Sequence, residues 1–261
     1  MRWFLRLAYD GTAYNGWQSQ PNATGVQSVI EKALSTMLRE DVKITGAGRT
    51  DTGVHARCMY AHFDTSRPIE SKEKFLSSLN RLVGRDIAVY ELFEVKDDTH
   101  ARFDAISRTY RYYVSGRKSP FSRGYSWECR RQLNVDAMNE AAALLLSVDD
   151  FTSFAKLHSD AKTNICKVTV ARWERIRIPR PEFGDEEMLV FTIKADRFLR
   201  NMVRAVVGTL VEVGLGKMTV DGFADVIRRK DRCSAGTSMP AQALFLEEIE
   251  YPETIRMNNF K

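Results

Sequence analysis

Cysteine and histidine are scarce in this chain of 261 residues, which has four of each. The cysteines, at positions 58, 129, 166 and 233, are far apart and form no Cys-x-x-Cys pair. This spacing argues against a zinc ribbon or a disulfide scaffold and predicts reduced thiols. No His-Glu-x-x-His motif occurs, and Asp51 with His55 is too small a ligand set for a closed metal site.

Long apolar runs are also lacking. The most apolar stretch, AVVGTLVEVGLG, contains Glu212 and is too short to cross a bilayer. The first residues, MRWFLRLAYDG, alternate between charged and apolar side chains and contain no apolar core of a signal peptide. These absences predict a soluble, cytoplasmic protein.

Acidic residues are slightly outnumbered, with 34 against 39 lysines and arginines, so that the net charge is +5. This excess weakly favours an anionic partner such as nucleic acid. Hydrophobic residues make up 44% and charged residues 28%, as is usual for a globular protein. The length suits one large domain or two modest ones.

Hydrophobic periodicity predicts an alternation of strands and helices. Strands are expected at 2–10, 59–63, 87–95, 107–114, 168–178, 188–195 and 244–250, and helices at 24–40, 72–82, 135–146, 199–213 and 220–229. Thr24 and Gln27 have capping-box spacing, and Asn134 is predicted to cap the helix at 135–146. Arg197, Arg200 and Arg204 are expected on one stripe of a single helix.

This order of elements predicts an α+β fold of two similar halves, each with a mainly antiparallel sheet packed against helices. The boundary is expected near residues 104–108. The N-terminal half then covers residues 1–105 and the C-terminal half covers residues 106–261.

The glycine-rich stretch GAGRTDTGVHA, at residues 46–56, concentrates polar side chains in one loop. It lacks the Gly-Lys-Ser/Thr ending of a Walker loop and the spacing of a dinucleotide-binding fingerprint, which disfavours nucleotide binding. A tight turn capped by Asp51 is a plain alternative. Because Arg49, Asp51 and His55 stand so close together, we favour a reactive carboxylate, held ionised by a cation from elsewhere in the chain.

The loop resembles the signature of the pseudouridine synthases, and other motifs follow in the order of one family. They are YDGTAYNGWQSQP (9–21), VQSVIEKAL (26–34), DDTHARFDAISRTYRYYV (97–114), DFTSFA (150–155), FLRNMVRAVVGTLVEVG (198–214) and YP (251–252). Nearly the whole chain is therefore similar to the tRNA pseudouridine synthase I family, the TruA type. It departs from the family pattern at Met59, Gly84, Thr99 and Ala243.

The resemblance implies a homodimeric enzyme with a basic active-site cleft between its two halves. Such an enzyme converts uridine to pseudouridine at positions 38 to 40 of the tRNA anticodon stem-loop, without metal or cofactor. The resemblance makes Asp51 the catalytic residue, with Tyr110 packed on the target base and Arg204 paired with the aspartate. Arg49 matches an arginine associated with base flipping. Four further residues fall at or near positions that contact tRNA in the family: His100, Arg102, Lys118 and Lys162.

Some roles stay open at this point. Tyr112 alternates with Tyr110 on the same strand face, and we expect it to pack in the core. His55 is expected to support the loop. A tRNA-binding protein or chaperone without chemistry is the alternative function, although RNA binding alone has no use for an aspartate facing phosphates.

Overall fold

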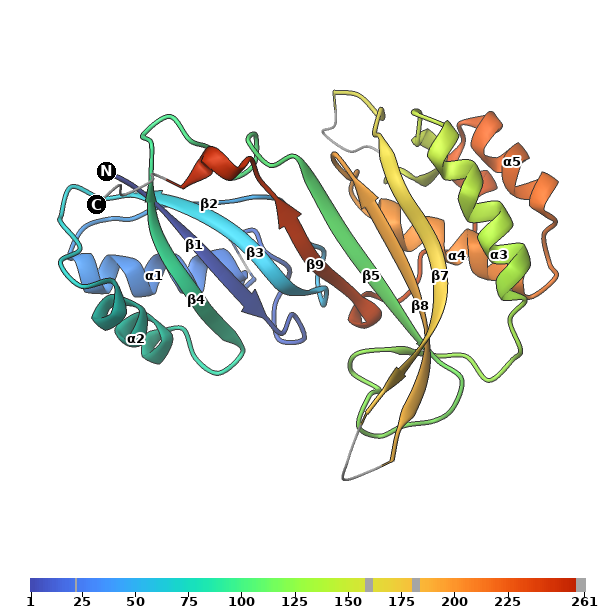
Figure 1. Cartoon of the computed structure of the whole chain (residues 1–261), viewed down its shortest axis with the longest axis horizontal. Helices are drawn as coiled ribbons and strands as arrows, with labels where there is room; N and C mark the ends of the chain where they lie inside the picture. Colours follow the sequence, from blue (N-terminus) through green and yellow to red (C-terminus); the bar gives the residue numbers. More distant parts are fainter. Residues whose placement is uncertain (22, 158–161, 180–183, 257–261) are drawn as a thin grey trace. The chain divides into compact units, whose positions relative to one another are not determined.

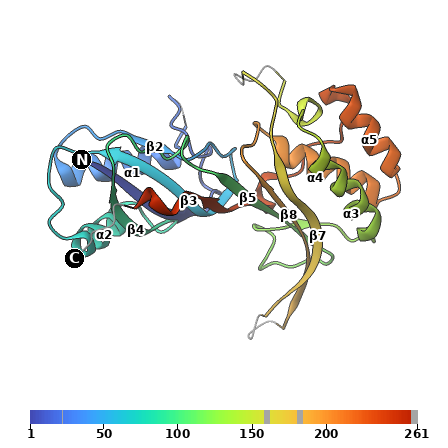
Figure 2. The same cartoon turned by 45° about the horizontal axis from the view of Figure 1, so that its top comes forward.

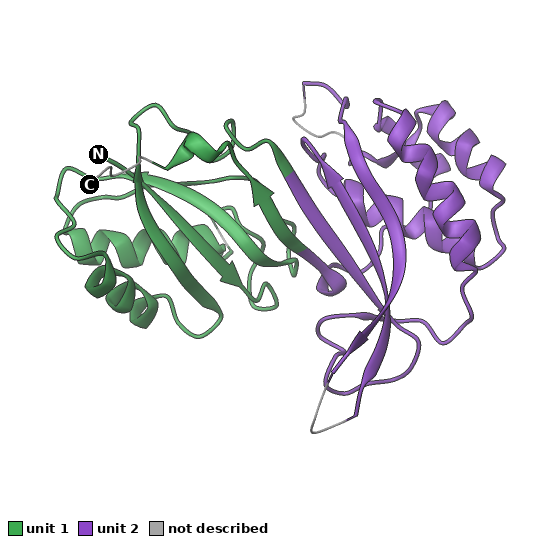
Figure 3. Ribbon diagram, viewed as in Figure 1, with its two compact units in different colours: residues 1–107, 246–261 green, residues 108–245 purple. Residues whose placement is uncertain are grey.

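The computed structural model describes residues 1–21, 23–157, 162–179 and 184–256. The chain divides into two units (Figure 3). Unit 1 comprises Met1–Ser107 and Leu246–Lys261, and unit 2 comprises Arg108–Phe245. No helix within the described ranges has the length and apolar character needed to span a membrane.

Unit 1 is a mainly antiparallel sheet with two helices (Figure 1). The central strand β1 (Arg2–Tyr9) lies between β3 (His55–Asp64) and β4 (Ile87–Val95), and both pairs are antiparallel. The short strand β2 (Ile44–Gly46) pairs with β3, and β9 (Leu244–Glu250) adjoins β3. The helices α1 (Val26–Leu38) and α2 (Lys72–Leu82) pack on each other, with α1 against β2 and α2 against β4.

Strand β1 buries apolar side chains on both of its faces. Trp3, Leu5, Leu7 and Tyr9 are buried on one face, as their alternation predicts. Phe4 on the opposite face is fully buried as well. It packs on the rings of His62, Phe93 and Tyr251.

The start of α1 differs from the prediction. The helix begins at Val26, its N-cap is Gly25, and no side chain caps it. The capping box expected from Thr24 and Gln27 is therefore wrong. The Gln27 amide instead donates to Glu31 Oε1 and to the carbonyl of Ile44. A long-range contact to β2 thus outweighs the local capping pattern.

Unit 2 contains the strands β5 (Ser107–Ser115), β8 (Glu186–Ala195) and β7 (Val168–Ile178), in that order and antiparallel. The two-residue strand β6 (Trp127–Glu128) runs parallel to β5. Three helices, α3 (Val135–Ala143), α4 (Met202–Gly214) and α5 (Val220–Arg229), lie on one side of β7 and β8 in both views (Figures 1 and 2). Helix α3 packs on β7, α4 and α5, and Asn134 caps it as predicted.

The start of α4 is the second difference. Helix 199–213 was expected, but α4 begins at Met202 because its N-cap Asn201 is left-handed, with φ of 66°. Arg197 and Arg200 therefore precede the helix, and the predicted arginine stripe is wrong: of the three, only Arg204 is helical. The predicted fold class, with mostly antiparallel sheet packed against helices, is confirmed.

Candidate active site

Asp51 lies in unit 1, in the segment of residues 47–54 that joins β2 to β3. The side chain is half-buried, and the Asp51 carbonyl accepts a hydrogen bond from Val54 N at 3.1 Å. The neighbouring Thr50 is fixed on two sides. Its hydroxyl lies 2.9 Å from the Tyr9 hydroxyl, and its carbonyl accepts from Trp17 N at 3.4 Å. The backbone on either side of the aspartate is thus held by β1 and by the segment that follows it.

Gly16 makes this arrangement possible. Its φ is +83°, and a Cβ atom added there would lie 2.2 Å from the Thr50 carbonyl oxygen. Only glycine allows both the left-handed backbone and this close approach without strain. Gly48 differs, because a Cβ atom there would meet no atom of the chain within 4 Å. The loop is therefore tightly packed at Gly16 and open at Gly48.

His55, the first residue of β3, contacts the segment that follows β1, and its support of the Asp51 loop stays a prediction. The ring is buried, and its Nδ1 accepts from Gly11 N at 3.0 Å and lies 3.1 Å from Asp10 Oδ1. Asp10 Oδ1 also accepts from the amide and the hydroxyl of Thr12. Arg49, two residues before Asp51, is exposed.

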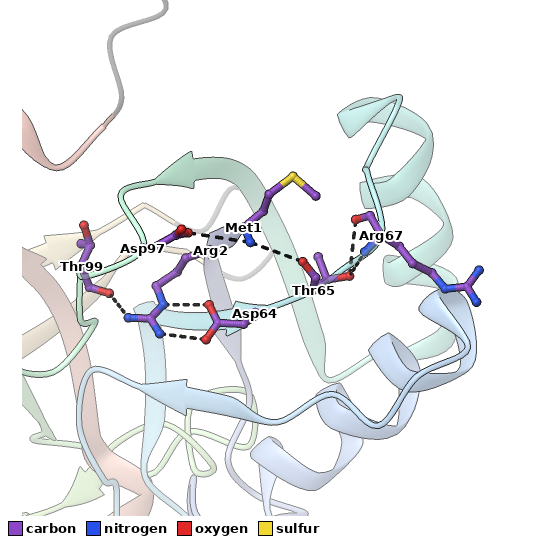
Figure 4. Close-up of polar contacts among 7 residues, drawn as sticks. All are labelled: Met1, Arg2, Asp64, Thr65, Arg67, Asp97 and Thr99. Atoms are coloured by element: carbon purple, nitrogen blue, oxygen red, sulfur yellow. Dashed lines mark hydrogen bonds and ion pairs between the residues drawn. The ribbon is translucent and has the colours of Figure 1, made fainter.

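A second loop of unit 1 carries His100 and Arg102, and an arginine anchors its start (Figure 4). The Arg2 guanidinium donates two hydrogen bonds of 2.8 Å to Asp64 and a third of 2.9 Å to the Thr99 carbonyl. The hydrogen bonds from Arg2 lower the pKa of Asp64. Thr99, one of the departures from the family pattern, contributes a backbone atom here, so this anchor does not depend on its side chain.

Two histidines hold the rest of this loop. His62 is buried on β3, and its Nδ1 accepts from Ala101 N at 3.0 Å. Burial, with the charges of Arg2 and His100, lowers the pKa of His62 to about 4, so it is neutral near pH 7. The His100 Nδ1 accepts from Arg102 N at 3.1 Å, which places the exposed Arg102 beside it.

In unit 2, the two tyrosines of β5 have different surroundings. Tyr112 is fully buried, donates to the Pro240 carbonyl at 3.1 Å and has its pKa raised by burial. The core role expected for Tyr112 is therefore confirmed. Tyr110 is half-buried, with its ring edge-on to Phe198 at a centroid distance of 5.0 Å. Of the two, Tyr110 keeps the more accessible ring.

Arg204, in the first turn of α4, is bound to the segment of residues 236–240. Its Nε donates to the Met239 carbonyl at 2.6 Å, and its own carbonyl accepts from Met239 N at 3.1 Å. Because Tyr112 bonds the next residue, Pro240, the buried tyrosine and the arginine are fixed on one short segment. The sequence pattern did not predict this segment, since nothing local marks residues 236–240 as a partner of α4.

The remaining predicted RNA contacts lie on the surface of unit 2. Lys118 is exposed just after β5, and Lys162 is exposed before β7. Among the described residues, no group of three histidine, cysteine, aspartate or glutamate side chains is placed to hold a metal ion. His158, the fourth histidine, lies outside the described residues.

Comparison with known proteins decides the family. A family model described as tRNA pseudouridine synthase matches residues 7–104 and 141–252, which include Asp51 and Arg204. The chain belongs to the tRNA pseudouridine synthase family. It is accordingly an isomerase that makes pseudouridine in tRNA.

Curated members of the tRNA pseudouridine synthase family are similar over nearly the full length. The tRNA pseudouridine synthase A of Bacteroides thetaiotaomicron is 55% identical, over 97% of this chain and 92% of the relative. That of Bacteroides fragilis is 53% identical, over 97% and 98%. That of Porphyromonas gingivalis is 52% identical, also over 97% and 98%. The similarity therefore includes the motifs that suggested the family and also the stretches of chain between those motifs.

Proposed function

We propose that this enzyme acts on the anticodon stem-loop of tRNA, at positions 38 to 40, with Asp51 as its catalytic residue. The observation that carries this is the build of the Asp51 loop. A half-buried carboxylate follows a backbone pinned by Gly16, Tyr9 and Trp17, while Gly48 nearby leaves open space. Such a loop can present one carboxylate to a nucleotide and admit the nucleotide's backbone beside it.

The reaction requires no second reactant. The N1–C1′ bond of uridine breaks, the uracil rotates, and C5 bonds to C1′; the proton on C5 is lost, and N1 takes up a proton. Asp51 can attack C1′, add to the uracil ring or act as a base, and the three routes place the same demand on the protein. Water must be kept from the reacting carbon, because hydrolysis would free the uracil.

The target uridine must leave its stack before it can react, at a cost of a few kcal/mol. We assign this step to Arg49, which is exposed two residues before Asp51 and can fill the vacated space. We assign substrate binding to Tyr110 and Arg204. A tyrosine that stacks on a base contributes about 1–3 kcal/mol, and the half-buried ring of Tyr110 suits that role better than the enclosed ring of Tyr112.

His100, Arg102, Lys118 and Lys162 are proposed to contact the RNA outside the reacting nucleotide. Arg102, Lys118 and Lys162 have exposed side chains of the charge that phosphates attract. We further propose that the enzyme is a homodimer and that it acts in the cytoplasm. All four cysteines are free thiols in the structure, which is consistent with a reducing compartment.

Tritium release tests the catalytic assignment. tRNA labelled with tritium at C5 of uridine is incubated with the wild type, with Asp51→Asn and with Asp98→Asn, an exposed aspartate in the same unit. We expect release with the wild type and Asp98→Asn, and none with Asp51→Asn, since the amide cannot act as nucleophile or base. Circular dichroism of each variant checks the fold. Release by Asp51→Asn at the wild-type rate would overturn the assignment, and binding of tRNA by the wild type without release would favour a non-catalytic binder.

Sequencing of the product tests the substrate position separately. Pseudouridine is mapped in tRNA from a strain that lacks this enzyme, before and after treatment with the wild type. We expect new pseudouridine only at positions 38 to 40. Modification elsewhere in the tRNA, with Asp51 still required, would keep the catalytic residue and correct the position.

A further inference from the structure

Unit 2 contains a cavity of about 680 Å³ whose lining includes five arginines and two carboxylates. None of these arginines is among the RNA contacts that the motifs suggest. We propose that this arginine cavity binds phosphate groups of the tRNA backbone. The proposal rests on the proposed function, since that function supplies the RNA.

The alternation of β7 brings two of the arginines to the cavity. Trp173 is buried, and the Asn139 side chain of α3 bonds its backbone N–H, at 2.7 Å, and its backbone carbonyl, at 3.1 Å. Arg175 and Arg177 follow on the same face of the strand. Figure 1 shows β7 and β8 running on beyond α3.

The opposite face of β7 explains why the arginines are directed to this side. Ile176 and Ile178 pack there against a buried cluster of Tyr113, Met188, Val190 and Phe245. A one-residue shift would bury the arginines and expose the isoleucines, so this cluster fixes the register. The charged face is therefore a consequence of the apolar one.

Other segments complete the cavity, and local contacts hold three of its arginines. Arg117, just after β5, donates to the Asp185 carbonyl at 3.0 Å, and Arg177 pairs with the Asp185 carboxylate. Arg130, just after β6, pairs with Glu128 at 2.6 Å. These contacts hold three guanidinium groups, and the two ion pairs neutralise the charges of Arg130 and Arg177.

Arg131 and Arg175 are the two lining arginines whose guanidinium groups have no protein partner in the described part of the chain. Within the described part of the chain neither forms an ion pair, and both are exposed. Beside them the lining is apolar, with Val114, Leu133 and Leu189 all buried. An apolar wall strengthens the field of nearby charges, and a guanidinium fork matches two phosphate oxygens.

A polyanion fits this cavity better than a free phosphate does. Exposed arginines bind a single small anion weakly in salt, because water and counterions screen them. An RNA backbone presents phosphates in series and releases condensed counterions when they are neutralised, which supplies free energy that a lone phosphate lacks. The cavity is also far larger than one phosphate needs.

The test is the salt dependence of tRNA binding by the double variant Arg131→Ala/Arg175→Ala. Loss of two phosphate contacts should make the slope of log K against log salt less negative by about 1.4–1.8. If the affinity extrapolated to 1 M salt is unchanged, binding at 0.15 M falls by about 15- to 30-fold. Arg131→Lys/Arg175→Lys keeps the charge and should retain most of the slope. Arg229→Ala, an exposed arginine on α5, is the matched control and should leave it unchanged.

An unchanged slope in the double alanine variant would overturn the proposal. Thermal stabilisation of the wild type, but not of the variant, by inorganic phosphate would then make the ligand a free anion. An altered oligomeric mass of the variant in the absence of RNA would instead make the cavity an interface between copies.

The proposed function is tested by a different measurement, the release of tritium. If the wild type releases tritium and the slope is unchanged in the variant, the proposed phosphate-binding role of the cavity is wrong and the proposed function stands. If the slope depends on the cavity arginines but the wild type releases no tritium, the cavity binds RNA and the proposed function is wrong.

Discussion

Replacing Gly208 with alanine tests how closely α4 packs against residues 236–240. Gly208 is buried in the middle of α4, and a Cβ atom there would lie 1.8 Å from the Thr237 carbonyl oxygen. That oxygen belongs to a segment held at both ends. Gly236 N donates to Thr209 Oγ1 at 2.9 Å, and Met239 N donates to the Arg204 carbonyl at 3.1 Å. The clash therefore cannot be relieved by turning a side chain.

Two opposing effects set the size of the change. Alanine is favoured over glycine inside a helix by about 1 kcal/mol. Overpacking a filled interior costs about 1–3 kcal/mol, and a contact this short with backbone belongs at the upper end. We therefore expect Gly208→Ala to lower the free energy of unfolding by about 2 kcal/mol, which lowers Tm by roughly 4–8 °C.

Thermal unfolding followed by circular dichroism measures this shift, and Gly222→Ala in α5 is the matched control. A Cβ atom at Gly222 would meet only side-chain atoms, Met218 Cγ at 3.0 Å and Thr219 Oγ1 at 3.3 Å. Its Tm should stay within about 2 °C of the wild type, since small side-chain shifts offset the helix-propensity gain. A Gly208→Ala protein that melts at or above the wild-type Tm would refute the packing argument.

Three further perturbations probe other parts of the molecule. The pKa of His62 is about 4 in the folded protein and about 6.5 in the unfolded chain. As the pH falls from 7 to 5, the unfolded chain therefore binds the proton first, and the free energy of unfolding should fall by about 2 kcal/mol. His62→Asn should flatten that profile in urea titrations, and an equally steep profile in the variant would contradict the assignment. Arg102→Ala should make the salt slope of tRNA binding less negative by about 0.7–0.9, as one lost phosphate contact requires; an unaltered slope would count against its contact with phosphate. Tyr112→Phe removes the bond to Pro240 and should cost about 1 kcal/mol of unfolding free energy, whereas a variant as stable as the wild type would show that the hydroxyl contributes nothing.

Elements with a strong period were predictable from sequence. Strands β4, β7 and β9 and helices α2 and α5 have the expected bounds, because each buries one apolar face and ends at a local signal. The start of α4 was not predictable, because the side chain of its left-handed cap Asn201 bonds Ser238, a residue remote in sequence. The start of α1 failed for a similar reason, since Gln27 bonds β2 rather than its own helix end.

The candidate site also has parts that the sequence predicts and parts that it does not. Asp51 stood out because polar side chains crowd a glycine-rich loop, and the motif order then pointed to Tyr110 and Arg204. The contact of Gly16 with Thr50 could not be inferred, because it depends on how two distant loops meet. The arginine cavity was equally hidden, since its arginines come from separate segments that the pairing of β5 with β6 and β8, and of β8 with β7, brings together.

Gly84 shows how a local departure from the family pattern can be tolerated. This glycine lies just after α2 with φ of +83°, a conformation that residues with a Cβ atom rarely adopt. The turn at this helix end is therefore a left-handed one of the kind that glycine favours. The strand that follows, β4, still begins at Ile87 as its pattern predicts.

The return of the chain to unit 1 at Leu246 has a consequence for synthesis on the ribosome. All of unit 2, Arg108–Phe245, is made as one uninterrupted stretch and can fold as soon as it emerges. Unit 1 is begun first, yet it acquires the strand that adjoins β3 only when the residues after Phe245 have been translated. Until then β2 pairs only three residues on that side of β3, and the rest of the edge is unpaired, which is a hazard for aggregation. The unit that carries Asp51 is thus the first to be started and the last to be completed.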